Sequence, residues 1–420
     1  MASGAAPSGV DGVVGVNGVV QLGEGFTANP YVLYDLLRRE RPVTRAQIPQ
    51  TPPFWLVTRH QDVRAALADP RLYKDTSALA RMLELAAGGN PRAARPALDV
   101  HDHMLNSDPP KHTRLRKLVS KAFTGRAIAQ LRPRIQGLAE TLAEAMVARL
   151  AAGRDSVDLI KEFAFPLPMT VICEILGVPD DRRTEFGVWS HTILSSSSAE
   201  EHIVATVAMG DYLAQLVADK REHPGEDILS AILAPDENAD RLTDTEATSM
   251  ASLLLVAGHE TTVNLIGNGT LALLRHPEQL AHLRADPALL PGAVDEFLRL
   301  DSPVNVATTR FTAQPVTIGG TTIPAGQVVL LGIGSANRDP SLFERPDDLD
   351  IERDRTGSLA FGHGIHYCLG APLARLEGEI AFRVLLDKFP TLALAAEPDD
   401  LAWHNSILLR GLAHLPVRAD

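Results

Sequence analysis

Apolar residues recur with helical spacing over most of the chain, and segments with strand-like patterns are few. The helical pattern covers residues 30–40 and 61–69 and dominates from residue 111 to about residue 275. Residues 54–59 form a β-branched and aromatic run, and residues 316–332 form several short runs joined by Gly and Pro turns. We therefore expect a mainly α fold with small β-sheets, an α+β class.

The best-marked helix begins at Thr243, because Thr243 and Glu246 have the spacing of a capping box. Its pattern is apolar on most sides and stops before Pro277, which gives about 30 residues and a length of about 45 Å. A helix that is apolar nearly all round is buried, so this one should cross the core. A second helical pattern, residues 373–389, follows Cys368.

Composition excludes several classes of protein. The formal net charge of −12 argues against non-specific nucleic-acid binding. The chain has only two cysteines, which excludes a disulfide scaffold and favours a reducing compartment. The sequence contains no apolar stretch of about 20 residues and no signal-peptide pattern. We expect a cytoplasmic monomer that does not contact a membrane.

The chain shows no linker between independent domains. Residues 1–25 are Gly-rich and are expected to be a flexible N-terminal segment, and residues 26–420 are expected to form one domain. Residues 76–110 are rich in Ala, Gly and Pro and have no sustained periodicity. A long irregular stretch of this kind is typical of a functional or mobile loop.

The most informative segment is Phe361–Gly370, with the sequence FGHGIHYCLG, because it places Cys368 where a Gly-rich loop enters a helix. Backbone N–H groups and the helix dipole at such a position favour a thiolate over a thiol. A thiolate held in this way is a suitable axial ligand for iron. Gly362, Gly364 and Gly370 would let the backbone approach a large flat cofactor.

The pattern Phe-Gly-x-Gly-x-His-x-Cys-x-Gly resembles the cytochrome P-450 superfamily, and five further segments from Asp108 to the C-terminus resemble it in the right order. The resemblance implies the cytochrome P-450 fold, with haem b between the long helix and the cysteine loop. It implies that Cys368 ligates the iron and that Phe361, Gly362, His366 and Gly370 contact the cofactor. Cys173 lies in an apolar helical pattern and is expected to be a core thiol.

The segment Ala257-Gly258-His259-Glu260-Thr261-Thr262 lies midway along the long helix, between apolar flanks. It resembles the acid–alcohol pair of the family, around which the helix opens to form an oxygen-binding groove. The resemblance implies that Ala257 lies against the haem and that Gly258 makes room for oxygen. It also implies that Thr261 hydrogen-bonds the oxygen and that Glu260 relays protons. We assign no role to His259, which should point away from the haem.

Haem propionates need cationic partners when they are buried. His112 and Arg116 are four residues apart and would share one face of a helix. The resemblance adds Arg310 and His366 to this set. Glu296 and Arg299 have the spacing of a helical ion pair, and the resemblance gives that pair a structural role beneath the haem, with Arg353 as a third member.

The resemblance also implies which elements contact the substrate: residues 76–110, 193–202, 304–308 and 406–408, together with the long helix. From these elements we expect Leu254, Val304, Val306 and Ile407 to contact the substrate. These residues are apolar, which suits a bulky lipophilic substrate. The sequence resembles the actinobacterial branch that oxidises macrolides and other polyketides, which also includes vitamin D and steroid hydroxylases.

The sequence has no nucleotide-binding fingerprint and no cysteine cluster, so electrons should come from a separate ferredoxin and an NAD(P)H-ferredoxin reductase. Residues 111–121 carry five Lys or Arg and no acid, and Arg114, Lys117 and Lys121 are a candidate docking patch. The expected reaction is hydroxylation or epoxidation by molecular oxygen. Two alternatives stay open: a peroxide-driven peroxygenase and a haem-binding sensor without turnover.

Overall fold

The computed structural model describes residues 18–49, 51–74, 102–194, 198–237 and 239–419. Helices make up most of it, as the sequence predicts. The α-helices are α1 (Glu24–Ala28), α2 (Tyr31–Glu40), α3 (His60–Ala68), α6 (Lys111–Ser120), α7 (Gly125–Gln130), α8 (Arg132–Ala151), α9 (Pro166–Leu176), α10 (Arg183–Leu194), α11 (Ala199–Glu222), α12 (Ile228–Leu233), α13 (Asp244–Arg275), α14 (Pro277–Ala285), α15 (Leu290–Leu300), α16 (Ile333–Ala336) and α17 (Ala371–Lys388).

The strands are short and form three sheets. They are β1 (Val20–Gln21), β2 (Val43–Gln47), β3 (Phe54–Val57), β4 (Leu72–Tyr73), β5 (Val157–Asp158), β6 (Arg310–Thr312), β7 (Val316–Ile318), β8 (Thr321–Ile323), β9 (Val328–Leu331), β10 (Leu392–Leu394) and β11 (Pro416–Ala419). The largest sheet has the order β1-β2-β3-β9-β6-β4, the second β10-β11-β5, and the third is the hairpin β7-β8. The α+β class predicted from the sequence is therefore confirmed.

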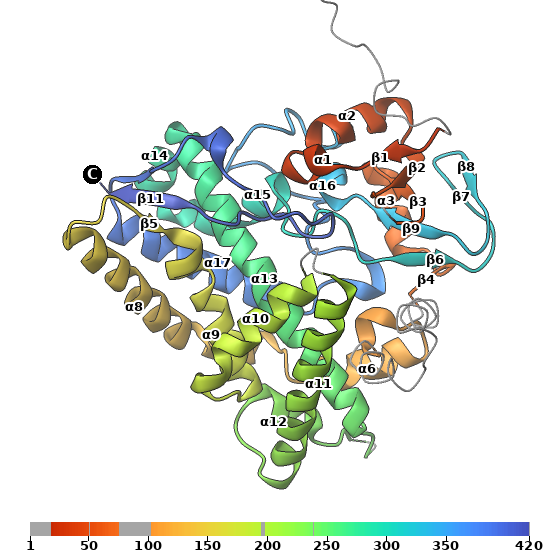
Figure 1. Ribbon diagram of the computed structural model, residues 1–420, viewed down its shortest axis with the longest axis horizontal. Helices are drawn as coiled ribbons and strands as arrows, with labels where there is room; N and C mark the ends of the chain where they lie inside the picture. Colours follow the sequence, from red (N-terminus) through yellow and green to blue (C-terminus); the bar gives the residue numbers. More distant parts are fainter. Residues whose placement is uncertain (1–17, 50, 75–101, 195–197, 238, 420) are drawn as a thin grey trace, which may run out of the picture.

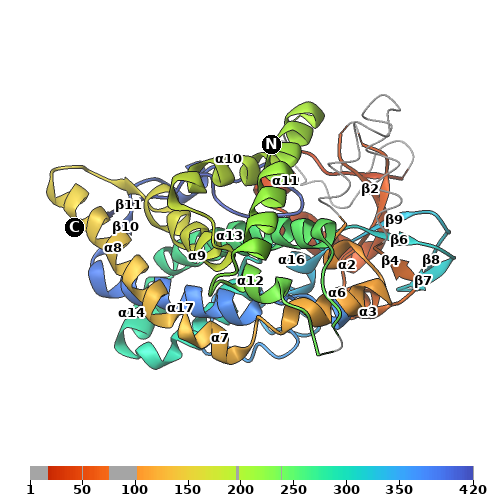
Figure 2. The ribbon, with the colours of Figure 1, turned by 90° about the horizontal axis from the view of Figure 1, so that it is seen from below.

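The helical part and the largest sheet lie side by side, and α13 crosses the helical part (Figure 1). Turned by 90°, the molecule shows α10 and α11 on one side of α13 and α17 on the other (Figure 2). The capping box predicted at Thr243 and Glu246 is present, and α13 runs for 32 residues. Most of its side chains are buried, which confirms that this helix crosses the core.

The main core fills the space between α6, α8, α9, α11, α13 and α17. Cys173 is fully buried in this core, which confirms the prediction of a core thiol. Burial raises the pKa of its thiol to about 12, because the charged form would lose its hydration. In the described residues, none of the helices is both long enough and apolar enough to cross a membrane.

One predicted boundary is wrong. Residues 18–25 were assigned to the flexible N-terminal segment, but Val20 pairs with Ala46 in the largest sheet and is fully buried. Leu22 is also buried, and α1 begins at Glu24. The error has a physical cause: two apolar residues among glycines have no readable periodicity, although they are enough to add an edge strand. Residues 1–17 lie outside the described residues.

Candidate active site

Three distant segments meet around one cavity of about 480 Å³. They are the middle of α13, the cysteine loop before α17, and the segment from the short 3-10 helix η2 (Met104–Asn106) through α6. Most of the site residues predicted from the sequence line this cavity. They are His112, Arg116, Leu254, Ala257, Gly258, Thr261, Val304, Arg310, Phe361, Gly362, His366, Cys368 and Gly370.

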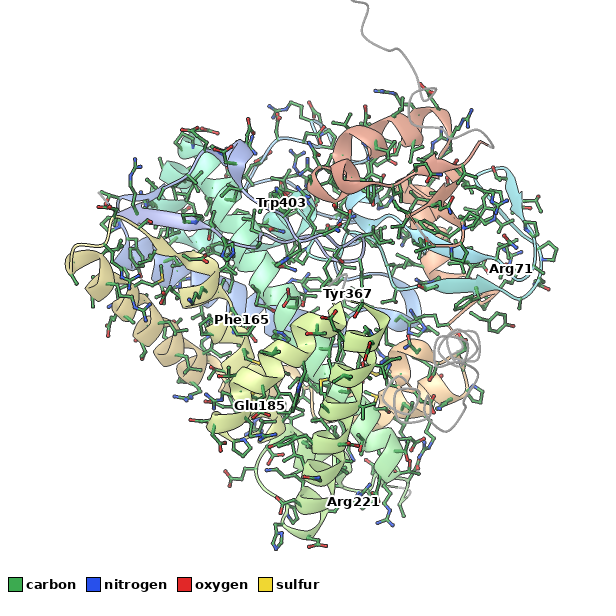
Figure 3. All side chains as sticks on the ribbon, in the orientation of Figure 1. Arg71, Phe165, Glu185, Arg221, Tyr367 and Trp403 are labelled. Carbon is green, nitrogen blue, oxygen red and sulfur yellow. The ribbon has the colours of Figure 1, made fainter. Side chains whose placement is uncertain are left out.

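The cysteine loop is held by its own backbone. Gly362 and Gly364 both have φ of +75°, a left-handed conformation that glycine adopts without strain. A Cβ on Gly364 would also lie 3.3 Å from the backbone of Leu67 and Ala68, so α3 packs directly on the loop. The N–H of Cys368 donates to the carbonyl of Phe361 at 2.9 Å, which closes the loop. Tyr367, next to Cys368, lies near the middle of the view in Figure 3 and is exposed.

The electrostatics of Cys368 differ in part from the prediction. Backbone N–H groups of Gly370 and Ala371, at the start of α17, lower the pKa of the thiol as expected. Desolvation by the surrounding chain acts in the opposite direction and is the larger effect, so the pKa is raised although the side chain is open to the cavity. The loop supplies N–H donors for a thiolate, and a metal ion bound there would favour deprotonation further.

On α13, Gly258 and Thr261 line the cavity and Glu260 does not. A Cβ on Gly258 would lie 3.0 Å from Cδ1 of Ile172, so this glycine also allows α9 to pack closely. The Thr261 hydroxyl donates to the carbonyl of Ala257 at 2.9 Å. Helix α13 is continuous through these residues, so the local opening implied by the resemblance is not seen in the described chain.

Glu260 is 6% exposed and lies in an apolar environment. Burial raises the pKa of its carboxyl to about 7. Oε2 lies 3.6 Å from Nε2 of His259. The His259 ring bonds the carbonyl of Leu255 at 2.9 Å and, as expected, does not line the cavity.

The predicted propionate partners gather at one end of the cavity. The rings of His112 and His366 are 4.5 Å apart, and Arg116 donates to the carbonyl of Tyr367 at 2.6 Å. Arg310 is buried, which lowers its pKa to about 10. Burial, together with the positive charges around it, lowers the pKa of His366 to about 2. The pKa of His112 is also lowered, chiefly by burial, so both histidines favour the neutral form.

Lys74 belongs to this cluster, although it carries no local sequence signal. It is buried directly after β4 and contributes to the lowered pKa of His366. Among the described residues, Asp108 is the carboxylate that counters Lys74 and Arg310. Lys74, Arg116 and Arg310 thus bring three basic side chains to His366.

Two of the four predicted substrate contacts are wrong. Leu254 and Val304 line the cavity, whereas Val306 and Ile407 pack in a separate cluster with α2 and the largest sheet. The cause is the backbone pairing of this segment. Val304 forms an isolated β-bridge with Leu409, whereas Val306 forms one with Gly332 and packs against the largest sheet. Sequence reasoning missed polar residues of the wall, because they are scattered over three elements. They are His103, Asn106, His202, Thr206 and Ser252.

The segments predicted to contact substrate are described only in part. Residues 76–101 and 195–197 lie outside the described residues. The described remainder contributes lining residues from each predicted segment: His103, Met104, Leu105, Asn106, Ile193, His202, Val304, Ala307, Thr308 and Leu408.

The candidate docking patch on α6 is largely neutralised. Arg114 forms ion pairs with Asp240 at 2.8 Å and with Glu246 at 2.7 Å, and Lys117 pairs with Asp236 at 3.0 Å. Lys121 donates to the carbonyl of Ala234. These cations tie α6 to the segment before α13, which weakens the hypothesis that they form a free basic surface.

The Glu296–Arg299 pair is fully buried. Arg299 donates to both carboxylate oxygens of Glu296, at 2.7 and 2.8 Å, and to backbone carbonyls of Asn337 and Pro346. Arg353 donates to Glu296 at 3.1 Å, as the third member. Glu296, Arg299 and Arg353 therefore form a buried triad that holds the segment 337–353 against α15. It is not an ordinary surface ion pair.

The sequence profile of cytochrome P-450 matches residues 190–411. The chain belongs to the cytochrome P-450 family. It is 52% identical to cytochrome P-450 107B1 of Saccharopolyspora erythraea, over 90% of this chain and 93% of that protein. It is 48% identical to vitamin D(3) 25-hydroxylase of Pseudonocardia autotrophica, over 93% of this chain and 94% of that enzyme.

The fold is also similar to that of solved cytochromes P-450. The tirandamycin C-bound monooxygenase TamI superposes with a TM-score of 0.86 at 48% identity, over 95% of this chain and all of that one. The chain is thus a cytochrome P-450 monooxygenase with haem b as its cofactor. The cavity fits this group, because the Cys368 thiol and the guanidinium groups of Arg116 and Arg310 line it together with many apolar side chains.

Proposed function

We propose that Cys368 ligates the haem iron and that the enzyme oxidises a bulky, neutral lipophilic compound with electrons from ferredoxin. The observation that carries this proposal is the convergence of Cys368, Thr261 and the propionate cations on one cavity. Segments separated by more than 100 residues supply these groups, and together they match what haem requires: an axial thiolate, cations for its carboxylates, and an apolar wall.

Haem, when bound, supplies the iron at which molecular oxygen is activated. The protein has to deliver protons to the cavity. The Thr261 hydroxyl can both donate and accept a hydrogen bond, and it lies at the cavity wall. Glu260 has a pKa of about 7 and can therefore exchange protons near neutral pH. Because Glu260 does not line the cavity, its proton reaches Thr261 through water or after a side-chain rotation.

The charged residues that line the cavity limit the class of compound that can bind. Among the described residues, none that lines the cavity is Asp or Glu, so these walls offer no partner to an amine-bearing compound. Leu254, Val304 and Met209 are apolar, while His202 and Ser252 can hydrogen-bond a hydroxyl or carbonyl group. The relatives named above include a vitamin D(3) hydroxylase and an enzyme bound to tirandamycin C. A macrolide, another polyketide, a steroid or a vitamin D-like compound fits these walls.

Ferredoxin and an NAD(P)H-ferredoxin reductase are proposed as the electron donors, since the sequence has no flavin or iron–sulfur motif of its own. A cytoplasmic location and a monomeric state stay predictions. The single domain also stays a prediction. Its first residue is now placed at about 18 in place of 26, because β1 belongs to the largest sheet.

The test is a screen of neutral lipophilic compounds for a shift of the haem absorbance, followed by turnover assays on the compounds that bind. Product formed with ferredoxin, reductase and NADPH supports the proposal. Product formed only with hydrogen peroxide would instead support a peroxygenase, and binding without product under either condition would support a sensor. Tight binding of a cationic compound in preference to its neutral analogue would contradict the proposed substrate class.

A further inference from the structure

Lys74 is a buried lysine whose ammonium group has a neutral partner. The residue directly follows β4 and is 3% exposed. Its Nζ donates to the hydroxyl of Thr308, and its backbone N–H donates to Oδ2 of Asp108 at 2.9 Å. Within the described part of the chain, Nζ has no carboxylate at ion-pair distance. A buried ammonium in this situation is costly unless an anion is supplied.

The charges around Lys74 increase this cost. Arg310, on β6, adds positive charge, and among the described residues Asp108 is the carboxylate that opposes it. Burial and Arg310 together lower the pKa of Lys74 well below its ordinary value. His366 and Arg116 are further basic neighbours in the cluster. A negatively charged ligand at this end of the cavity would relieve the repulsion.

Thr308, Arg310 and His366 line the cavity together with Arg116 and His112, whose ring lies 4.5 Å from that of His366. Lys74 is not itself a lining residue, but its Nζ contacts Thr308, which is. A carboxylate bound at this wall would lie among basic side chains. We propose that Lys74 is a further residue of the haem-propionate site, held in place by Thr308 and Asp108. This inference extends the propionate site proposed above for His112, Arg116, Arg310 and His366, and it rests on that proposal.

Haem loss from the holoenzyme tests the role of Lys74. Haem transfer to excess apomyoglobin is measured for the parent, for Lys74→Met and for Lys111→Met. Lys111 is the matched control, because its ammonium group already has a carboxylate partner, Asp102, in a half-exposed ion pair. Loss of one hydrogen bond to a charged group predicts transfer roughly 10- to 100-fold faster in Lys74→Met. The control should transfer haem at the parent rate.

Haem dimethyl ester separates a propionate contact from a structural role, because esterification removes the carboxylate charges. Reconstituted with this ester, the parent and Lys74→Met should lose the cofactor at equal rates. The apoprotein of Lys74→Met should unfold at the parent temperature or above, since an uncompensated buried cation has gone. Three results would each overturn the proposal. Lys74→Met could lose native haem at the parent rate, it could lose the ester faster than the parent does, or its apoprotein could unfold at a lower temperature than the parent apoprotein.

Arg310→Met, measured in parallel, shows which proposal fails. If Arg310→Met accelerates the loss of native haem and leaves the loss of the ester unchanged, the propionate site stands. A Lys74→Met variant that lacks this pattern then removes Lys74 alone. If neither variant shows it, the propionate site itself is placed wrongly, and the inference about Lys74 falls with it.

Discussion

The buried triad of Glu296, Arg299 and Arg353 gives the sharpest quantitative prediction. Glu296→Gln keeps the shape of the side chain and removes the carboxylate charge. Glu296 and Arg299 are both fully buried, so the two guanidinium groups would lose their counter-ion without gaining access to water. Arg299 keeps its bonds to the carbonyls of Asn337 and Pro346, at 2.9 and 2.7 Å, which limits the loss.

Breaking a buried ion pair on one side costs about 3–5 kcal/mol, whereas whole proteins have unfolding free energies of roughly 5–15 kcal/mol. Glu296→Gln should therefore lose a large part of the stability and yield little haem-loaded protein. Glu144→Gln is the control, because Glu144 pairs with Lys388 at 2.8 Å and both side chains are exposed. An exposed pair of this kind contributes about 0.2–1 kcal/mol.

The assay is denaturant unfolding followed by circular dichroism, with the ratio of haem to protein measured on the same preparations. A much lower unfolding midpoint is expected for Glu296→Gln than for Glu144→Gln, with a similar slope. Equal midpoints for the two variants would refute this expectation, since the triad would then contribute no more than a surface pair.

Two further predictions concern α13. Thr261→Ala keeps helix propensity and removes the hydroxyl at the cavity wall. Haem and substrate should bind normally, while NADPH is consumed and hydrogen peroxide forms in place of product. If the ratio of product to NADPH equals that of the parent, Thr261 has no part in proton delivery. Burial raises the pKa of Glu260 to about 7, so its contribution to stability is fully present below its ordinary pKa and is lost as the pH rises through 7. The melting temperature of Glu260→Gln should therefore fall less than that of the parent between pH 5 and pH 8, and equal falls would show that Glu260 ionises without penalty.

Local signals in the sequence were enough to predict the central elements of the fold and site. The capping box at Thr243 fixes the start of α13 through contacts within one turn, and both of its hydrogen bonds are present. The glycines of the cysteine loop are predicted from the sequence for close backbone approach to a cofactor, and the structure adds that Gly362 and Gly364 have φ of +75°. Such features depend on neighbours in the sequence, so a single sequence contains them.

Features that depend on distant partners could not be predicted in the same way. The cations of α6 look like a basic surface until Asp236 and Asp240, more than 100 residues away, are placed beside them. Val306 and Val304 are indistinguishable in sequence, and only their bridges to Gly332 and Leu409 separate them. Lys74 has no local motif, and its significance comes from the residues of β6, η6 (Gly364–His366) and α6 that surround it.

The central claim is that Cys368 is the axial ligand of the haem iron, and the absorbance spectrum of the reduced carbon monoxide complex tests it most directly. Thiolate ligation shifts the Soret band of that complex to the position from which the family takes its name. Cys173→Ser is the matched control, because Cys173 is fully buried in the core and lies away from the cavity. The account predicts the shifted band in the parent and in Cys173→Ser, and its complete loss in Cys368→Ser. A Cys368→Ser protein that binds haem and keeps the shifted band would contradict it.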